Sequence, residues 1–479
     1  MKHKLLLSAL SASIGILAAA YAATTSTGAS QSTAPSSPTP AASIMPLSIP
    51  TSTDASTRQM TISPAAMAAS RRPFIAGVQT HFAYASAAYY LPDRAAALVN
   101  ALGVNGFRDD IYWNSFAPDW DLQGSHLPSE ITNFWSRTAA RPLLIVNNGN
   151  SYISGTSPPL TEEGRSHFAG FAARVAAAGA AKNALFEIWN EWNMNAVKGR
   201  ANLTDAGAAN DPRAALYYAP LAQAASRAIR AKAPAATILV AASGDDEGWP
   251  WTREVVRLGG AKYADGLSVH LYNHCQAPQL RNATEFVDRL DKLRATIADL
   301  PDGKKPIYVT EFGWPTGSNK CAVSQVEQGN NVAQFYLWAA ATPWIGGAWY
   351  YQLKDSGQNW GDIQDNFGLY DYRYLGKFAS CTTRESMALI NSAQSIEIER
   401  PYSDMFVLKI RTAWGYQIVS WTSRADVTRY LRVGGADSFY ARRMCGDNTA
   451  INNREVSIGS TPVVFIVHSK ATTPVFARR

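Results

Sequence analysis

The sequence is poor in charged residues and in cysteine for its length. Asp, Glu, Lys and Arg together make up 17% of its 479 residues, and four cysteines occur. No two of them have the Cys-x-x-Cys spacing of a zinc site, and no cluster of histidines accompanies them. No glycine fingerprint for a dinucleotide or phosphate follows the early apolar segments, and no Lys/Arg run resembles a nucleic-acid-binding arm. We therefore expect no metal, no organic cofactor and no nucleic-acid partner.

Residues 1–22 have the pattern of a secretory signal peptide. A basic start is followed by an apolar run, and the small-x-small ending Ala20-Tyr21-Ala22 predicts cleavage after Ala22. No later stretch reaches the roughly 20 apolar residues of a membrane span, and no cysteine follows the run to accept lipid. We expect a secreted or periplasmic protein without an integral membrane segment once the signal peptide is removed.

Residues 23–70 are dominated by Ser, Thr, Pro and Ala and contain few large apolar side chains. Such a composition does not offset the entropy lost on ordering, so we predict a flexible linker. From Pro73 the composition changes, and the chain as a whole is 47% hydrophobic with 14 Trp and 21 Tyr. These values predict a large folded core and more than one domain. The net charge of +7 is mild and favours a solvated basic face over a polyanion-binding surface.

The four cysteines are Cys275, Cys321, Cys381 and Cys445, and their number fits an oxidising compartment. Four cysteines allow three pairings, and sequence alone does not choose between them. We favour Cys275 with Cys321, and Cys381 with Cys445.

Eight short apolar segments alternate with Ala-rich segments between residues 73 and 353. The Ala-rich segments repeat apolar residues every three or four positions, as an amphipathic helix does. Eight strands, each followed by a helix over roughly 300 residues, match a (β/α)8 barrel better than an open doubly wound sheet. We predict an α/β fold with a (β/α)8 TIM barrel at residues 71–383. The predicted strands lie in PFIAGVQTHF (73–82), GVNGFRDD (103–110), RPLLIVNN (141–148), ALFEIWNE (184–191), ATILVAAS (236–243), GLSVHLYN (266–273), KPIYVTEF (305–312) and GGAWYYQL (346–353).

The helical periodicity ends after the barrel. Segments such as FVLKIRTA and YQIVSWTS then alternate apolar and polar residues, which is typical of half-buried antiparallel strands. We predict a small all-β sandwich domain at residues 384–479.

Polar and aromatic residues stand where the predicted barrel strands end. The carboxyl ends of the strands carry the active site in barrels of this kind, so these residues are candidates for it. Strand four ends in Asn190 and Glu191, and strand seven ends in Glu311. The other candidates are His81 near the end of strand one, Arg108 in strand two, His270 and Tyr272 at strand six, and Trp349 in strand eight.

Two carboxylates at strands four and seven suit the hydrolysis of a glycosidic bond. One carboxylic acid protonates the leaving oxygen, while the other, about 5 to 5.5 Å away in retaining enzymes, attacks the anomeric carbon. A nucleophile surrounded by hydrogen-bond donors stays ionised, and its charge favours the protonated form of its partner. Glu191 and Glu311 therefore predict a glycoside hydrolase that needs neither a metal nor an organic cofactor.

The segments FEIWNEWN (186–193) and YVTEFGWPTG (308–317) resemble the two catalytic signatures of clan A glycoside hydrolases. Within the clan, the sequence is most similar to glycoside hydrolase family 39 and related glycosidases of bacterial exopolysaccharide loci, with family 5 as the rival. The resemblance covers about residues 73–383. One departure is Trp192, which follows Asn-Glu where many clan members have proline.

The resemblance implies a role for each candidate. Glu191 corresponds to the acid/base and Glu311 to the nucleophile, while Asn190 would bind the sugar 2-hydroxyl. It also implies that Tyr272 and Arg108 donate to Glu311 and keep its pKa low. The remaining implied positions are His270 beside these groups and Trp349 as the floor of the subsite next to the cleavage point.

Each assignment has a structural alternative. An Asn-Glu dipeptide alone is expected about once by chance in such a chain, so the case for Glu191 depends on its place at a strand end. Arg108 also fits a simple ion pair with Asp109 or Asp110, because a buried arginine needs a partner. The candidates that also fit an ordinary core are His81, His270, Tyr272 and Trp349.

Tryptophans in the predicted loops bear on the size of the substrate. Most of them also fit ordinary packing, but exposed ones would line a groove for a long glycan: Trp113, Trp120, Trp249, Trp251, Trp314 and Trp360. We predict a retaining β-glycosidase that is endo-acting on a bacterial exopolysaccharide or a plant β-glycan. The alternative among enzymes is an exo-acting β-xylosidase-like glycosidase. The alternative of another class is a non-catalytic glycan-binding or polysaccharide-assembly protein, against which the presence of both Glu191 and Glu311 argues.

Overall fold

The computed structural model describes most of the chain from residue 74 onward. The described ranges are 74–84, 89–113, 127–147, 150, 158–180, 183–196, 211–434, 438–449, 451, 454–468 and 475–477. The predicted signal peptide and linker lie outside them.

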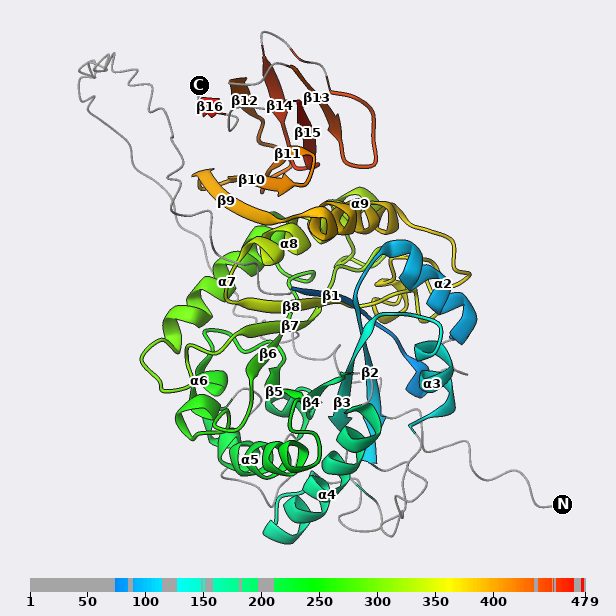
Figure 1. Cartoon of the computed structure of the whole chain (residues 1–479), viewed down its shortest axis with the longest axis vertical. Coiled ribbons are helices and arrows are strands. Elements are labelled where there is room, and N and C mark those ends of the chain that lie inside the picture. The colour runs from blue at the N-terminus through cyan, green and yellow to red at the C-terminus, as the bar shows by residue number, and fades with distance from the viewer. Residues whose placement is uncertain are drawn as a thin grey trace, which may run out of the picture. The chain divides into compact units, whose positions relative to one another are not determined.

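Eight parallel strands close into a barrel in chain order, and a helix follows each strand (Figure 1). The predicted (β/α)8 barrel is therefore confirmed. The strands are β1 (Ile75–Gln79), β2 (Gly106–Tyr112), β3 (Arg141–Asn147), β4 (Leu185–Ile188), β5 (Thr237–Ser243), β6 (Gly266–Leu271), β7 (Ile307–Phe312) and β8 (Ile345–Tyr350). The helices are α2 (Pro92–Leu102), α3 (Ser129–Trp135), α4 (Glu162–Gly179), α5 (Ala215–Lys232), α6 (Pro250–Arg257), α7 (Ala283–Thr296), α8 (Gln325–Ala341) and α9 (Phe378–Ser392).

Several helices begin at a polar side chain that accepts hydrogen bonds from the first turn. Asn282 accepts from the backbone N–H groups that open α7, and Thr161 does the same for α4. Ser324 and Glu327 form a reciprocal capping box at the start of α8. These caps satisfy backbone donors that a helix leaves unpaired, so the sequence fixes where these helices start.

The barrel interior at the amino ends of the strands is filled by an apolar layer. Its buried members are Ile75, Leu143, Leu185, Leu239 and Trp349. Glycine in β1 makes room for the indole, because a Cβ at Gly77 would lie 2.1 Å from Trp349 Cδ1. The layer leaves the opposite, carboxyl ends of the strands for polar side chains.

The chain after α9 forms two antiparallel sheets, which confirms the predicted all-β region. The five-stranded sheet has the order β13-β15-β11-β10-β9 and the three-stranded sheet the order β14-β12-β16. Apolar residues from both sheets, including Ile418 and Ile458, share one buried cluster. The strands are β9 (Ser395–Tyr402), β10 (Met405–Thr412), β11 (Gly415–Thr422), β12 (Arg429–Gly434), β13 (Ser438–Arg443), β14 (Glu455–Ile458), β15 (Val463–His468) and β16 (Val475–Ala477).

Two disulfides join segments that are distant in sequence. Cys275 bonds to Cys321, which links the loops after β6 and β7, and Cys381 of α9 bonds to Cys445 after β13. These are the two pairings favoured from the sequence. Among the described helices, none combines the length and the apolar character that crossing a membrane requires.

Candidate active site

The carboxyl end of the barrel gathers all the predicted site residues except Trp349 into one connected group. Arg108 projects from β2, His270 from β6 and Glu311 from β7, while Glu191 lies just after β4. Parallel strands of a barrel end on the same face, so residues far apart in sequence meet there.

Arg108 is the centre of this group, and its side chain is 1% exposed. Nη1 donates to Glu311 Oε1 at 2.5 Å, Nη2 donates to Asn190 Oδ1 at 2.9 Å, and Nε donates to Glu187 Oε2 at 2.7 Å. Nη1 also donates to Gln79 Oε1 at 2.8 Å. A guanidinium has five donors in a rigid fork, so these partners fix the direction in which it faces Glu311. The bond to Asn190 Oδ1 leaves the amide NH2 of Asn190 as the group that can donate to a sugar hydroxyl.

The two aspartates next to Arg108 have other surroundings. Asp109 is fully buried and its carboxylate accepts from Thr80 Oγ1 at 2.7 Å and from the backbone N–H of Phe82 at 2.9 Å. Burial raises the pKa of Asp109 to about 6, and burial raises the pKa of Asp110 to about 7 although the Arg108 charge opposes it. Arg108 forms its ion pairs with Glu187 and Glu311.

Glu187 is a site residue that the sequence analysis did not single out. It lies in β4, is fully buried, and forms an ion pair with Arg108. Its Oε1 has no hydrogen-bond partner among the described residues. A buried arginine shared between two carboxylates is better compensated than one facing a single carboxylate, so Glu187 supports the orientation of Arg108. The signal in the sequence was a charge inside the apolar strand LFEI.

Glu311 ends β7 and is held by donors on both carboxylate oxygens. Tyr272 Oη donates to Oε2 at 2.6 Å, and Arg108 donates to Oε1. Burial alone raises the pKa of Glu311, but the charges of His270 and Arg108 and the two hydrogen bonds outweigh burial and hold its pKa at about 2. Glu311 is therefore ionised at neutral pH, as a carboxylate nucleophile must be.

Glu191 meets His270 across the mouth of the barrel. His270 Nδ1 lies 2.9 Å from Glu191 Oε1 and 3.6 Å from Glu311 Oε2. Arg108 Nη2 lies 3.4 Å from Nε2 of the same ring, and a carboxylate oxygen of Glu191 accepts from an Nδ1–H group. Burial alone lowers the pKa of His270, but the charge of Glu311 and the hydrogen bond to Glu191 raise it. One side-chain atom from each of Glu191, His270 and Glu311 lies within 4.8 Å of the others, so the two carboxylates are close neighbours at the carboxyl end of the barrel.

The backbone that presents Glu191 is in the left-handed region. Trp189 has φ 69° and Glu191 has φ 46°, a conformation that costs residues with a Cβ about 1 to 3 kcal/mol each. The N–H of Trp189 donates to Val146 O at 2.8 Å, and the N–H of Glu191 donates to Ala242 O at 3.0 Å. These bonds to the flanking strands β3 and β5 hold the turn in place.

His81 lies at the end of β1, half-buried, with its ring edge-on to Tyr351 at a centroid distance of 5.4 Å. Burial lowers the pKa of His81 to about 4, so the ring is neutral at neutral pH. Tyr351, just past β8, was also missed by the sequence analysis. Its ring contacts Tyr272 at 6.2 Å, and burial together with the charge of Glu311 raises its pKa. Tyr351 is thus the aromatic residue that strand eight contributes to the mouth.

The expectation that Trp349 forms the floor of a sugar subsite is wrong. Trp349 is fully buried in the apolar layer at the amino ends of the strands, with its indole against Gly77 and Gly106. Side chains of a barrel strand alternate between the inside and the outside, so residues 349 and 351 both face inward, two steps apart along the axis. The sequence shows the aromatic residues but not the depth at which each one lies.

The tryptophans in the loops also differ in burial, and most of those that the structure describes are core residues. Trp113, Trp249, Trp251 and Trp314 are each at most 1% exposed and pack in the core, while Trp120 lies outside the described residues. Trp360, in the segment between β8 and α9, is 53% exposed.

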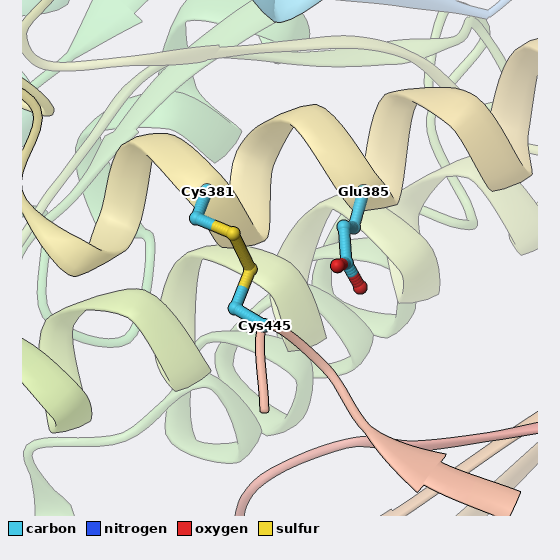
Figure 2. A group of neighbouring side chains, drawn as sticks. All are labelled: Cys381, Glu385 and Cys445. Atoms are coloured by element: carbon cyan, nitrogen blue, oxygen red, sulfur yellow. A yellow bond between two sulfur atoms is a disulfide. The ribbon is translucent and has the colours of Figure 1, made fainter. Parts of the chain in front are cut away.

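Among the residues that the structure describes, two groups of side chains have the elements of a metal site, and neither group suits a bound metal ion. Figure 2 shows Cys381 and Cys445 joined as a disulfide beside Glu385, so these sulfurs are not thiolate ligands. Glu385 instead pairs with Arg442 at 2.7 Å. The other group is Glu191, His270 and Glu311, where a cation would compete with the Arg108 guanidinium for Glu311.

The closed barrel and this site define the chain as a retaining glycoside hydrolase of clan A, an enzyme acting on O-glycosyl bonds. More particularly, the chain belongs to the cellulase family, glycosyl hydrolase family 5, whose family model matches residues 67–350. The predicted clan A glycoside hydrolase is thereby confirmed, and its substrate is a carbohydrate.

Solved structures show the same fold at low sequence identity. A family 39 glycoside hydrolase from the gut symbiont Bacteroides cellulosilyticus WH2 has a TM-score of 0.64 and 19% identity, covering 83% of this chain and 81% of that one. The family 39 enzyme from Xanthomonas axonopodis pv. citri has a TM-score of 0.52 and 13% identity, with 87% and 96% covered. A family 39 β-xylosidase from Caulobacter crescentus has a TM-score of 0.51 and 13% identity, with 86% and 98% covered. No curated protein matches the chain by sequence.

Proposed function

We propose that the protein is a secreted or periplasmic retaining β-glycosidase in which Glu311 is the nucleophile and Glu191 the acid/base. The observation that carries the proposal is the pair of donors on Glu311, because Arg108 and Tyr272 keep this carboxylate ionised within a few ångströms of Glu191. The two disulfides support an oxidising compartment for the folded chain.

In the first step a Glu311 oxygen attacks the anomeric carbon while Glu191 protonates the glycosidic oxygen. The bond from carbon to the leaving oxygen breaks as the ester bond to Glu311 forms, and the leaving sugar departs as an alcohol. The Asn190 amide donates to the sugar 2-hydroxyl. Tyr272 and Arg108 remain on the carboxyl group of Glu311 as its charge is lost.

In the second step Glu191, now a carboxylate, removes a proton from water. The water oxygen attacks the anomeric carbon, the ester bond breaks, and Glu311 regains its charge. Two displacements on opposite faces return the sugar to its original configuration, so the product retains the β anomer. His270 donates its Nδ1 hydrogen to the Glu191 carboxylate in this state.

We further propose a polymer substrate, a bacterial exopolysaccharide or plant β-glycan cut internally. Trp360 supports this, since a largely exposed indole offers a flat apolar face for a sugar ring. Its loop is fixed, because Ser318 N–H donates to Trp360 O at 2.9 Å and Asn366 Nδ2 donates to Asn359 O at 2.8 Å. The exo-acting alternative is favoured by the fold shared with the β-xylosidase from Caulobacter crescentus.

The test is a product profile on β-glucans, xylans and purified exopolysaccharides, with the anomeric configuration followed by NMR. Internal cleavage of a polymer with blocked ends supports endo action, whereas release of xylose from chain ends only would establish the exo alternative. Net inversion would refute the retaining mechanism. Glu191→Gln and Glu311→Gln should each lose cleavage, and a polymer that the wild type binds without cutting would instead indicate the non-catalytic alternative.

A further inference from the structure

The carboxylate of Glu191 lies directly over Gly244, the residue that follows β5. A Cβ built on Gly244 would lie 2.7 Å from Glu191 Oε1 and 2.8 Å from Glu191 Cδ. Carbon contacts this short do not persist in folded proteins, so a side chain at position 244 would force the carboxylate to move. The space that Glu191 occupies therefore exists because residue 244 is glycine.

Asn193 holds Gly244 in this place through both of its backbone polar groups. Asn193 Nδ2 donates to Gly244 O at 2.7 Å, and Gly244 N–H donates to Asn193 Oδ1 at 3.1 Å. The Asn193 side chain is fully buried. A primary amide is the side-chain group that can both donate and accept in this geometry, so Asp or Leu at this position would lose at least one of the two bonds.

The strand that leads to Gly244 also holds the backbone of Glu191. The register of β5 against β6 shifts between Ala241 and Ser243, and both Ala241 and Ala242 have positive φ, 89° and 43°. A bulge of this kind redirects the strand, and here the Ala242 carbonyl accepts from the N–H of Glu191 at 3.0 Å. The end of β5 therefore holds the backbone of Glu191 through a hydrogen bond, and Gly244 leaves the space that the Glu191 carboxylate occupies.

Tyr218 of α5 links the ends of β4 and β5 through two hydrogen bonds and packs against Trp192. Tyr218 Oη donates to Ile188 O at 2.7 Å and accepts from Ala241 N–H at 2.9 Å. Trp192 is fully buried, with its ring 5.6 Å from that of Tyr218. The departure from proline at position 192 therefore adds a packing residue behind the turn.

We propose that Asn193 and Gly244 are positioning residues that set the place from which Glu191 delivers its proton. The inference rests on the proposed role of Glu191 as acid/base. The donors on Glu311 come from β2 and from the end of β6, so a displaced Glu191 leaves the nucleophile and its two hydrogen bonds in place.

The experiment compares leaving groups that differ in their need for a proton. Gly244→Ala and Asn193→Ala are assayed on 2,4-dinitrophenyl and phenyl β-glucosides and on the same pair of β-xylosides. A dinitrophenolate departs without protonation, while a phenolate needs the acid, which contributes about 10²- to 10⁴-fold to such steps. We expect kcat/KM for the phenyl glycosides to fall at least about 100-fold in Gly244→Ala, against less than about 5-fold for the first turnover on the dinitrophenyl glycosides.

Asn193→Ala should show the same selectivity with a smaller loss, since it loosens Gly244 without filling the space. The matched control is Gly170→Ala in α4, where an added Cβ meets only Arg174 Nη1 at 3.7 Å, and it should leave both rates unchanged. Equal losses on both leaving groups in Gly244→Ala and Asn193→Ala would overturn the proposal, because a general loss of structure does not distinguish leaving groups.

A crystal structure of Gly244→Ala gives a second result that needs no substrate. The proposal predicts a Glu191 carboxylate displaced from its wild-type place with the Arg108–Glu311 pair unmoved. An unmoved carboxylate overturns it. If the wild-type enzyme cleaves none of the four glycosides and no polymer of the panel, the proposed function fails, while the position of this carboxylate still decides the positioning role. If Gly244→Ala does not fold, the crystal structure and rates of Asn193→Ala decide it.

Discussion

Tyr272 donates its hydroxyl to Glu311 Oε2 at 2.6 Å, on the opposite oxygen from the one that Arg108 holds. The carboxylate thus has a neutral donor on one side and a cationic donor on the other. Its ionised form is stabilised against the cost of burial, and each donor should be visible in the pH dependence of the enzyme.

Removal of the neutral donor tests this arrangement. Tyr272→Phe keeps the ring but deletes the hydrogen bond, so the pKa of Glu311 should rise from about 2. A carboxylate nucleophile must be ionised, so activity is lost as the pH falls through its pKa. The acidic limb of the kcat/KM profile should therefore move to higher pH by up to about one unit. We also expect kcat to fall about 10-fold. Tyr218→Phe, a buried tyrosine bonded to Ile188, is the control that should leave the limb in place; an unmoved limb in Tyr272→Phe would contradict the role.

Glu187 should matter through Arg108. Glu187→Gln removes the charge but keeps the shape, leaving Arg108 with one carboxylate partner inside the barrel. We expect the free energy of unfolding in urea to fall by about 2 kcal/mol and kcat to fall about 10-fold, because the guanidinium is less firmly held. Glu399→Gln, which alters the pair with Lys409 in the C-terminal β region, should leave kcat unchanged. If Glu187→Gln matches the wild type in both measurements, its support of Arg108 is wrong.

Trp360 should serve long substrates more than short ones. Trp360→Ala is expected to raise KM for the cleaved polymer about 3- to 10-fold, which corresponds to the loss of one aromatic contact, and to leave aryl glycosides unaffected. Trp414 lies between β10 and β11 and is 97% exposed, so Trp414→Ala is the matched control and should change neither value. Equal effects of the two substitutions on the polymer would argue against a sugar contact at Trp360.

Asp110 should make the fold less stable as pH rises. Burial raises the pKa of Asp110 from 3.8 to about 7, so the folded state keeps a proton that the unfolded chain releases at lower pH. The stability it contributes is present below about pH 3.8 and is lost as pH rises to about 7. Asp110→Asn should therefore raise the free energy of unfolding at pH 8 by up to about 4 kcal/mol, with no difference from the wild type near pH 4. Parallel stability curves for the two proteins between these pH values would contradict the raised pKa.

Most of the residues that were singled out by their position at a strand end lie near one another in the structure. Glu191 and Glu311 are separated by three strands in sequence, and the closed barrel brings their side chains close together. Glu187 was missed because a charge inside an apolar strand carries no sign of which partner it will meet. Only the alternation along β4, with Leu185 also inside the barrel, places it beside Arg108.

Depth along the barrel axis was the quantity that sequence reasoning lacked. Trp349 and Tyr351 have the same direction and similar chemistry, but the register of β8 against β1 pairs Trp349 with Gly77, at the apolar layer. Tyr351 lies one inward step further and reaches Tyr272. Moving β8 by two residues along the barrel axis would place a different inward-facing residue at the site. The sequence of one strand does not show its register with the neighbouring strand, so it does not show which residue reaches the site.

The sequence by itself determined the alternation of eight strands and helices, the antiparallel region after them, and the two carboxylates at strands four and seven. These follow from local apolar periodicity and from the chemistry of single residues, which need no knowledge of distant neighbours. Only the tertiary structure decided that Arg108 is shared between Glu187 and Glu311, that Trp349 is core, and that Gly244 and Asn193 border Glu191. Each of these depends on the closure and register of the barrel, which set the distance between residues that no local pattern connects.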